Sequence, residues 1–205
     1  MSTSPYVLRY MRQEDITQVL DIDHLSFPLP WSARSYTFEI TDNNHSHMVS
    51  LALSDRKSSS AGWLGALQRL RNGSHAHETI VGYGGFWLID GEAHISTIAV
   101  HPHYRGKGLG ELLLAGMLGR GMALDAEYSV LEVRVGNEPA ISLYRKYEYE
   151  IAGRRKNYYR DNGEDAFLMN LAPLSPSYKT RFASRLEQLH QRLDYRDQFT
   201  LRPAR

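Results

Sequence analysis

A glycine-rich stretch near the middle of the chain has the composition of a turn that binds phosphate. It reads Arg105, Gly106, Lys107, Gly108, Leu109 and Gly110. An apolar run typical of a strand precedes it, and leucines at helical spacing follow it. Glycines let a backbone approach a ligand closely, and the start of a helix directs N–H groups and its dipole at an anion. The stretch therefore predicts a diphosphate-binding turn, with Arg105 and Lys107 as supporting cations.

Two common phosphate motifs do not fit this stretch. A P-loop requires Ser or Thr after its lysine and a glycine five positions before the second glycine, but Gly108 follows Lys107 and His101 stands at the earlier position. The dinucleotide fingerprint requires a third glycine at position 111, which is Glu111. A helix-initiating loop without a ligand remains the plain structural alternative.

Glu132 lies in a strand-like run in which charged and aliphatic residues alternate. It shares one face with Val130 and Arg134, and the opposite face is purely aliphatic, with Leu131, Val133 and Val135. A central strand of a covered sheet rarely exposes such a face, so a carboxylate there indicates a site. The alternative is a solvated strand face.

A helix expected from Asn137 to about Tyr147 carries two more polar candidates. Asn137 is suited to capping the helix, with Pro139 in the first turn. Tyr144 is a phenol that stays protonated at neutral pH and can donate a proton, but it is equally suited to being a core aromatic. Elsewhere, the nine histidines show no metal-ligand spacing.

These residues carry a family resemblance. Arg105-x-x-Gly108-x-Gly110 after a strand resembles the acetyl-CoA pyrophosphate signature of the GNAT superfamily, and the element order is similar from about Tyr6 to Leu171. Further stretches resemble the RimI type, the ribosomal-protein-alanine N-acetyltransferases. They are Phe27 to Ser32, Leu131 to Arg134 with Asn137 and Leu143-Tyr144, and Arg155 to Tyr159 followed by Glu164-Asp165-Ala166.

The resemblance implies a substrate and roles for particular residues. Acetyl-CoA is the expected co-substrate, with no metal, and the residues expected to bind it are Ile98, Ala99, Val100, Arg105, Gly106, Lys107, Gly108, Leu109, Gly110, Asn137 and Tyr144. Glu132 is the expected general base and Tyr144 the expected acid for the departing thiolate. Trp31, Tyr158 and Tyr159 are expected to shape a peptide groove, with plain aromatic packing as the alternative.

The expected reaction is direct transfer of an acetyl group to the N-terminal α-amine of a protein. The resemblance indicates the N-terminal alanine of a ribosomal small-subunit protein. An α-amine has a pKa of about 7.7–8.0 against about 10.4 for lysine, which makes it the easier acceptor near neutral pH. The alternatives are a GNAT enzyme that acetylates a lysine side chain or a small amine, and a non-catalytic acyl-CoA-binding module.

The elements that must position these residues follow from periodicity and turn signals. Strands are expected at 6–11, 48–53, 79–89, 92–100, 130–135, 149–159 and 165–171, and helices at 16–25, 32–40, 108–123 and 137–147. This order predicts an α/β (α+β) domain with a mixed sheet. The resemblance implies the GNAT fold, in which a single mixed, mostly antiparallel sheet is flanked by helices and splayed at strands 4 and 5.

The chain divides into an acetyltransferase domain over residues 1–172 and a basic helical extension over 173–205. A Ser-, Gly- and Arg-rich insertion at 54–78 interrupts the domain. The extension has seven Lys or Arg and three Asp or Glu, with apolar residues at helical spacing. It is expected to pack on its own domain, and a basic contact to ribosome or RNA is the alternative. Glu148 stands where the family usually has a helix-ending glycine.

Composition excludes several other classes of protein. The net charge of the 205 residues is +1, which argues against a protein that binds nucleic acid through its overall positive charge. No direct nucleic-acid binding is expected. The chain has no cysteine, so a disulfide framework and a thioester intermediate on the enzyme are excluded. No signal-like or membrane-spanning run occurs, and a cytoplasmic protein is expected.

Overall fold

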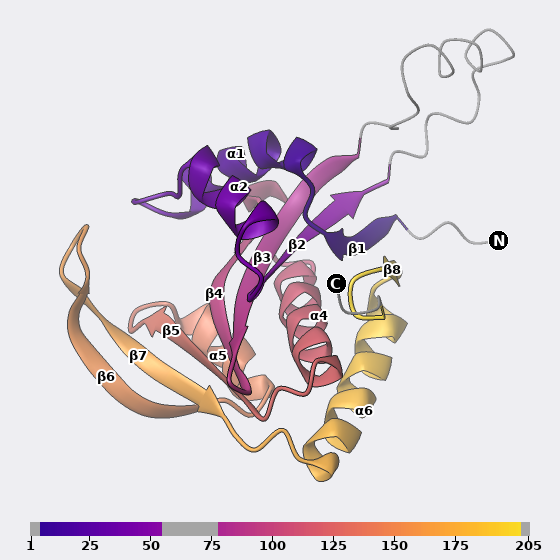
Figure 1. Cartoon of the computed structure of the whole chain (residues 1–205). Coiled ribbons are helices and arrows are strands. Elements are labelled where there is room, and N and C mark those ends of the chain that lie inside the picture. Colours follow the sequence, from indigo (N-terminus) through magenta and orange to yellow (C-terminus); the bar gives the residue numbers. More distant parts are fainter. Residues whose placement is uncertain (1–4, 55–77, 202–205) are drawn as a thin grey trace, which may run out of the picture.

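A single mixed sheet organises the part of the chain that the computed structural model describes, residues 5–54 and 78–201. Its strand order is β6-β7-β5-β4-β3-β2-β1-β8 (Figure 1). The strands are β1 (Tyr6–Tyr10), β2 (Ser46–Leu53), β3 (Thr79–Ile89), β4 (Glu92–Val100), β5 (Tyr128–Arg134), β6 (Glu150–Tyr159), β7 (Glu164–Leu171) and β8 (Tyr195–Asp197). Nearly all of the insertion expected at 54–78 lies outside the described residues.

Local sequence signals explain where several elements begin and turn. The β3–β4 turn places Asp90 and Gly91 at φ 47° and 80°, the left-handed conformations that a tight hairpin requires. Helix α2 (Ala33–Thr41) begins after Ser32, whose side chain accepts the Ser35 N–H. The other α-helices in the described residues are α1 (Ile16–Ser26), α4 (Leu109–Ala123), α5 (Glu138–Lys146) and α6 (Pro176–Arg192).

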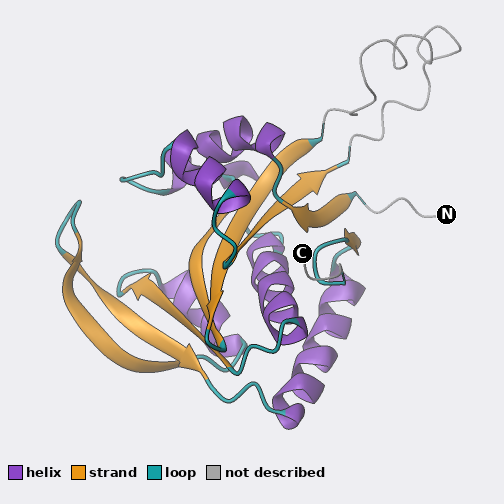
Figure 2. Ribbon diagram, viewed as in Figure 1, coloured by secondary structure: helices purple, strands orange, loops and turns teal. Residues whose placement is uncertain are grey.

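Helices cover both faces of the sheet (Figure 2). Helices α1 and α2 pack on one face through a cluster that includes Val19, Ile22 and Tyr36 against Tyr83 of β3. Helix α4 covers the other face, where twelve of its fifteen residues are buried. This burial on all sides fits a helix that is sandwiched between the sheet and α6. The buried residues of α4 belong to the larger of the two core clusters, which also includes residues of α5 and α6.

Strands β4 and β5 diverge, as the family resemblance implies. They pair in parallel only over Glu92–Ile95 with Tyr128–Leu131. Beyond Ile95, β4 continues to Val100 and remains paired with β3 on its other side. The sheet is therefore open between the carboxyl-terminal half of β4 and that of β5, and the expected mixed, splayed architecture is confirmed.

The C-terminal residues join the sheet as well as the helical layer. Helix α6 forms over the range that its apolar spacing predicts, and Tyr178, Phe182 and Leu189 are buried in the core. After α6 the chain adds β8, which pairs in parallel with β1, Tyr195 opposite Tyr6. No sequence pattern predicts this strand, because three residues are too few to show a periodicity of two.

Candidate active site

The glycine-rich turn forms an open cradle at the start of α4. Gly106 and Gly108 have φ of 75° and 81°, and Gly108 occupies the N-cap position. A Cβ atom added at either glycine would meet nothing within 4 Å. The predicted turn therefore has both the backbone conformation and the free space that a diphosphate next to a helix N-terminus requires, so the residues present fit the pyrophosphate of acetyl-CoA.

The two predicted cations of this turn are held by the protein itself. The Arg105 guanidinium donates from Nε to the Val100 carbonyl oxygen at 3.0 Å and from Nη2 to Ser26 Oγ at 3.1 Å. Arg105 thus ties the end of β4 to the end of α1. Lys107 Nζ lies 5.0 Å from the centre of the Tyr104 ring. Leu109 is buried in the core, and Gly110 leaves room for Val100 and Leu143.

The predicted β4 residues lie where β4 and β5 have separated. Ile98, Ala99 and Val100 pair with β3 and have no partner on β5. This backbone edge faces the open part of the sheet, directly before the glycine-rich turn. An extended ligand could add to it as an extra strand would.

A cavity of about 450 Å³ begins at the same opening and gathers most of the other predicted site residues. Among its lining residues are Ile98 of β4, Glu132 of β5, Asn137 and Tyr144 at α5, Trp31 of the α1–α2 loop, and Tyr158 and Tyr159 of β6. Ala99, Val100 and the residues from Arg105 to Gly110 are not among them. The predicted residues thus form two adjoining groups, one at the turn and one in the cavity.

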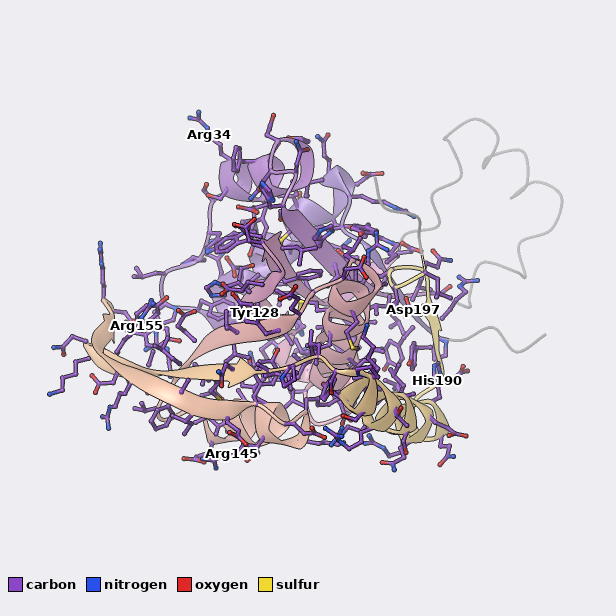
Figure 3. The ribbon with its side chains drawn as sticks, turned by 60° about the horizontal axis from the view of Figure 1, so that its bottom comes forward. Arg34, Tyr128, Arg145, Arg155, His190 and Asp197 are labelled. Carbon is purple, nitrogen blue, oxygen red and sulfur yellow. The ribbon has the colours of Figure 1, made fainter. Side chains whose placement is uncertain are left out.

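Glu132 is bound by the His94 imidazole and the Arg155 guanidinium. Its Oε2 accepts a hydrogen bond from His94 Nε2 at 2.8 Å, and its Oε1 lies 3.2 Å from Arg155 Nη1. Glu132 keeps 12% of its side-chain surface exposed, within the cavity lining. The ring of Trp87 meets the His94 ring edge to face at 5.7 Å and limits its movement. Arg155 lies on the β6–β7 hairpin, away from α6 (Figure 3).

This arrangement shifts the pKa values of both His94 and Glu132. The hydrogen bond with Glu132 raises the pKa of His94 above its ordinary 6.5, although burial opposes the shift. The hydrogen bond from His94 lowers the pKa of Glu132 below 4.5, again against burial. Near neutral pH the carboxylate is therefore ionised and the imidazole is the more basic of the two groups. The pair can accept a proton as a unit.

Tyr144 and Asn137 enter the cavity from α5. Asn137 Oδ1 accepts the Ala140 N–H at 3.3 Å and caps the helix, as its sequence context predicts. Tyr144 is 5% exposed, and its ring lies 5.8 Å from that of Tyr149. Burial raises the pKa of the Tyr144 phenol, so it remains protonated and able to donate.

Aromatic residues surround the mouth of the cavity. Asp23, buried in α1, accepts hydrogen bonds from the Trp31 backbone N–H at 2.6 Å and from the Tyr83 hydroxyl. These hydrogen bonds fix the α1–α2 loop on β3. Tyr158 and Tyr159 meet edge to face at 5.2 Å. Together with Phe27 they also line a more open hollow of about 850 Å³ that continues outward along the hairpin. The cavity and this hollow share Phe27, Tyr158 and Tyr159 in their linings and therefore adjoin at the mouth.

Three residues of this site had no predicted role: Asp23, His94 and Arg155, of which only Arg155 stood in a family-like stretch. The available signal for His94 was the alternation of Glu92 and His94 with the apolar Ala93 and Ile95, which gives β4 a polar face. Nothing local showed that this face meets Glu132. Among the described residues, no group of three or more His, Asp or Glu side chains could hold a metal ion. Likewise, no described helix is long and apolar enough to cross a membrane.

Known proteins resemble this chain in sequence and in fold. The chain is 36% identical over 162 residues, 79% of its length and 92% of the relative's, to a Bacillus subtilis (strain 168) protein provisionally named a ribosomal protein bS18-alanine N-acetyltransferase. It is 30% identical over 165 residues, 80% of its length and 91% of the relative's, to an N-alpha-acetyltransferase of Saccharolobus solfataricus.

A solved structure has the same fold. The crystal structure of the Escherichia coli ribosomal-protein-S18-alanine N-acetyltransferase matches with a TM-score of 0.64 at 22% identity, covering 82% of this chain and 94% of that one. Residues 16–149, which run from α1 to the corner after α5, match the acetyltransferase (GNAT) family model. From this match and the relatives together, we conclude that the chain belongs to the GNAT acetyltransferase family.

Proposed function

We propose that this protein transfers the acetyl group of acetyl-CoA to the N-terminal α-amine of a protein. As acceptor we propose the N-terminal alanine of a small-subunit ribosomal protein, because the relatives above are named for this reaction. The observation that carries the proposal is the position of the Glu132–His94 pair. It shares one cavity with Tyr144, and this cavity adjoins the splayed β4 edge. We also propose a cytoplasmic site of action, where ribosomal proteins are made.

Acetyl-CoA would occupy the turn and the open edge of β4. Its diphosphate would lie over Gly106 and Gly108 at the start of α4, and Ile98 and Val100 would pair with the pantetheine amides. The Val100 N–H or a neighbouring amide would polarise the thioester carbonyl. Arg105 would act chiefly by fixing the end of β4, since its guanidinium already binds the Val100 carbonyl.

The transfer itself requires two proton movements. The amine nitrogen attacks the thioester carbon, forming the N–C bond, and the amine proton passes to the Glu132–His94 pair directly or through water. The C–S bond then breaks, and the thiolate takes a proton from the Tyr144 phenol. The high pKa of Tyr144 keeps the phenol protonated, and the phenol can donate to the thiolate as negative charge develops on sulfur.

The charges around Glu132 favour an α-amine over lysine. A protonated amine that enters this site meets Arg155 and, at acid pH, the His94 imidazolium. An α-amine is about 10% unprotonated near pH 7, whereas a lysine side chain is far below 1%. The site therefore selects the acceptor that more often arrives neutral. The aromatic mouth, with Trp31 and Tyr158, fits a peptide that continues outward from its first residue.

A peptide panel tests this proposal. Peptides of equal length that begin with Ala, Ser or Met are incubated with acetyl-CoA, together with an N-blocked peptide containing lysine. We expect acetylation of the free N-termini, with the highest kcat/KM for Ala. Acetylation of only the lysine peptide would overturn the proposed acceptor. Tight CoA binding with no transfer to any amine would instead favour a non-catalytic acyl-CoA-binding module.

A further inference from the structure

The corner between α5 and β6 contains a residue, Glu148, in a strained backbone conformation. Glu148 has φ 69°, the left-handed conformation in which only glycine is free of steric cost. The chain turns here from the helix that carries Tyr144 into β6. A residue with a side chain persists in this conformation when surrounding contacts hold it.

Two arginines of the C-terminal helix provide those contacts. Arg181 donates from Nε and Nη2 to the two Glu148 carboxylate oxygens at 2.8 and 2.6 Å, and Arg185 Nη2 donates to Oε1 at 2.6 Å. These hydrogen bonds, the one from Arg181 foremost, lower the pKa of Glu148 to about 2. Both carboxylate oxygens of Glu148 are thus bound by side chains from outside the family-matched segment.

A second carboxylate, that of Glu111 on α4, binds side chains at the end of α5 and on α6. Glu111, in the first turn of α4 and 8% exposed, accepts hydrogen bonds from Lys146 Nζ at 2.6 Å and from the Tyr147 hydroxyl at 3.2 Å, both at the end of α5. Arg192, in the last turn of α6, donates to both of its oxygens at 3.1 and 3.2 Å. Helices α4, α5 and α6 therefore meet at one buried acid.

The corner between α5 and β6 is hydrogen-bonded directly to the backbone of Tyr144. The Tyr144 carbonyl accepts the backbone N–H groups of Tyr147 at 2.9 Å and of Tyr149 at 3.1 Å. The Tyr178 hydroxyl of α6 in turn donates to the Tyr147 carbonyl at 3.4 Å. A movement of residues 147–149 would therefore shift the end of α5 and the phenol one turn before it.

We propose that the C-terminal helix is a brace for the active site, in which Glu148 is a positioning residue that fixes the end of α5 and thereby the Tyr144 phenol. The proposal deepens the function given above and rests on it for the role of Tyr144. It assigns a purpose to the basic extension: Arg181, Arg185 and Arg192 bind acids of the same chain.

The test compares variants that separate positioning from folding. Glu148→Gln removes the charge, and Glu148→Gly removes the charge while also relieving the backbone strain. Arg181→Gln removes one arm of the contact, and Arg181→Lys keeps its charge. Glu187→Gln is the matched control, because Glu187 is an exposed acid on α6. For each variant we would measure kcat, both KM values, the melting temperature and amide hydrogen exchange of residues 138–149.

We expect Glu148→Gln and Glu148→Gly both to lower kcat by about fivefold with acceptor KM unchanged, because a misplaced catalytic group costs rate rather than acceptor affinity. Exchange in residues 141–149 should accelerate in both, while the Gly variant keeps the wild-type melting temperature. Arg181→Lys should retain most of kcat, and Arg181→Gln should not.

Wild-type kcat and exchange in Glu148→Gly would overturn the brace, because the carboxylate would then only offset its own strain. Loss of kcat in proportion to melting temperature, with unchanged exchange in the native state, would also overturn it and leave a folding role. Failure of the proposed function is distinguishable: the wild-type protein would then acetylate no amine, and the exchange measurement would still test the brace.

Discussion

Replacing Glu132 by Gln should remove most of the base catalysis while leaving the fold intact. Glutamine has the same shape, and its amide oxygen can still accept the 2.8 Å hydrogen bond from His94. The change removes the negative charge that faces His94 and Arg155. A positioned general base contributes about 10²–10⁴ in rate, so we expect kcat/KM at pH 7 to fall by about 100-fold or more.

The size of this defect should depend on pH. About 10% of an α-amine with a pKa near 8 is unprotonated at pH 7, and about 90% is unprotonated at pH 9. The larger free-amine fraction raises the rates of wild type and variant alike, but at pH 9 hydroxide can take the amine proton in place of the missing carboxylate, so the defect of the variant should shrink to about tenfold. The assay is steady-state acetylation of a peptide that begins with Ala, from pH 6 to pH 9.5. The rate is measured from the CoA thiol that each transfer releases.

The matched control for this series is Glu127→Gln. Glu127 is an exposed acid directly before β5, outside the cavity lining. It should show wild-type rates throughout. If Glu132→Gln had the wild-type kcat/KM and the wild-type pH profile, the assignment of Glu132 to the proton-accepting pair would be refuted.

Three further outcomes are expected. Tyr144→Phe should lower kcat by about 10- to 100-fold with little change in acceptor KM, because the buried phenol donates only as the thiolate leaves; rapid-quench kinetics would measure this step. Gly108→Ala should weaken CoA binding, measured by calorimetry, and cost about 1 kcal/mol of folding free energy because φ is 81° there. Gly110→Ala has room for its Cβ and should cost no folding free energy in urea unfolding. The Glu132–His94 pair should stabilise the fold by up to about 1 kcal/mol between pH 4.5 and 6.5. Its contribution is lost as pH falls through the lowered pKa of Glu132 or rises through the raised pKa of His94, so His94→Gln should destabilise more at pH 5.5 than at pH 9 in thermal melts.

Local signals in the sequence were sufficient for most of the fold. The Asp90-Gly91 turn and the Ser32 and Asn137 caps each act through contacts within a few residues of the chain. Such signals are readable without knowledge of the tertiary structure. The confirmed helices and the β3–β4 hairpin follow from them.

The parts that sequence reasoning missed depend on contacts between distant residues. His94 meets Glu132 because β4 and β5 pair in a particular parallel register, His94 opposite Val130, and no local pattern encodes that register. Strand β8 forms because β1 offers it an edge, Tyr195 opposite Tyr6. Likewise, the carboxylate of Glu148, which has φ 69°, is bound by arginines more than 30 positions away.

Locating the acetyl group on an intact acceptor would test the central claim most directly. The protein, acetyl-CoA and a small-subunit ribosomal protein with an N-terminal alanine are incubated together, and tandem mass spectrometry maps the modified atom. The account predicts one acetyl group, on the alanine α-nitrogen, and its loss with Glu132→Gln at pH 7. Acetyl groups found on lysine side chains with the α-amine unmodified would contradict it.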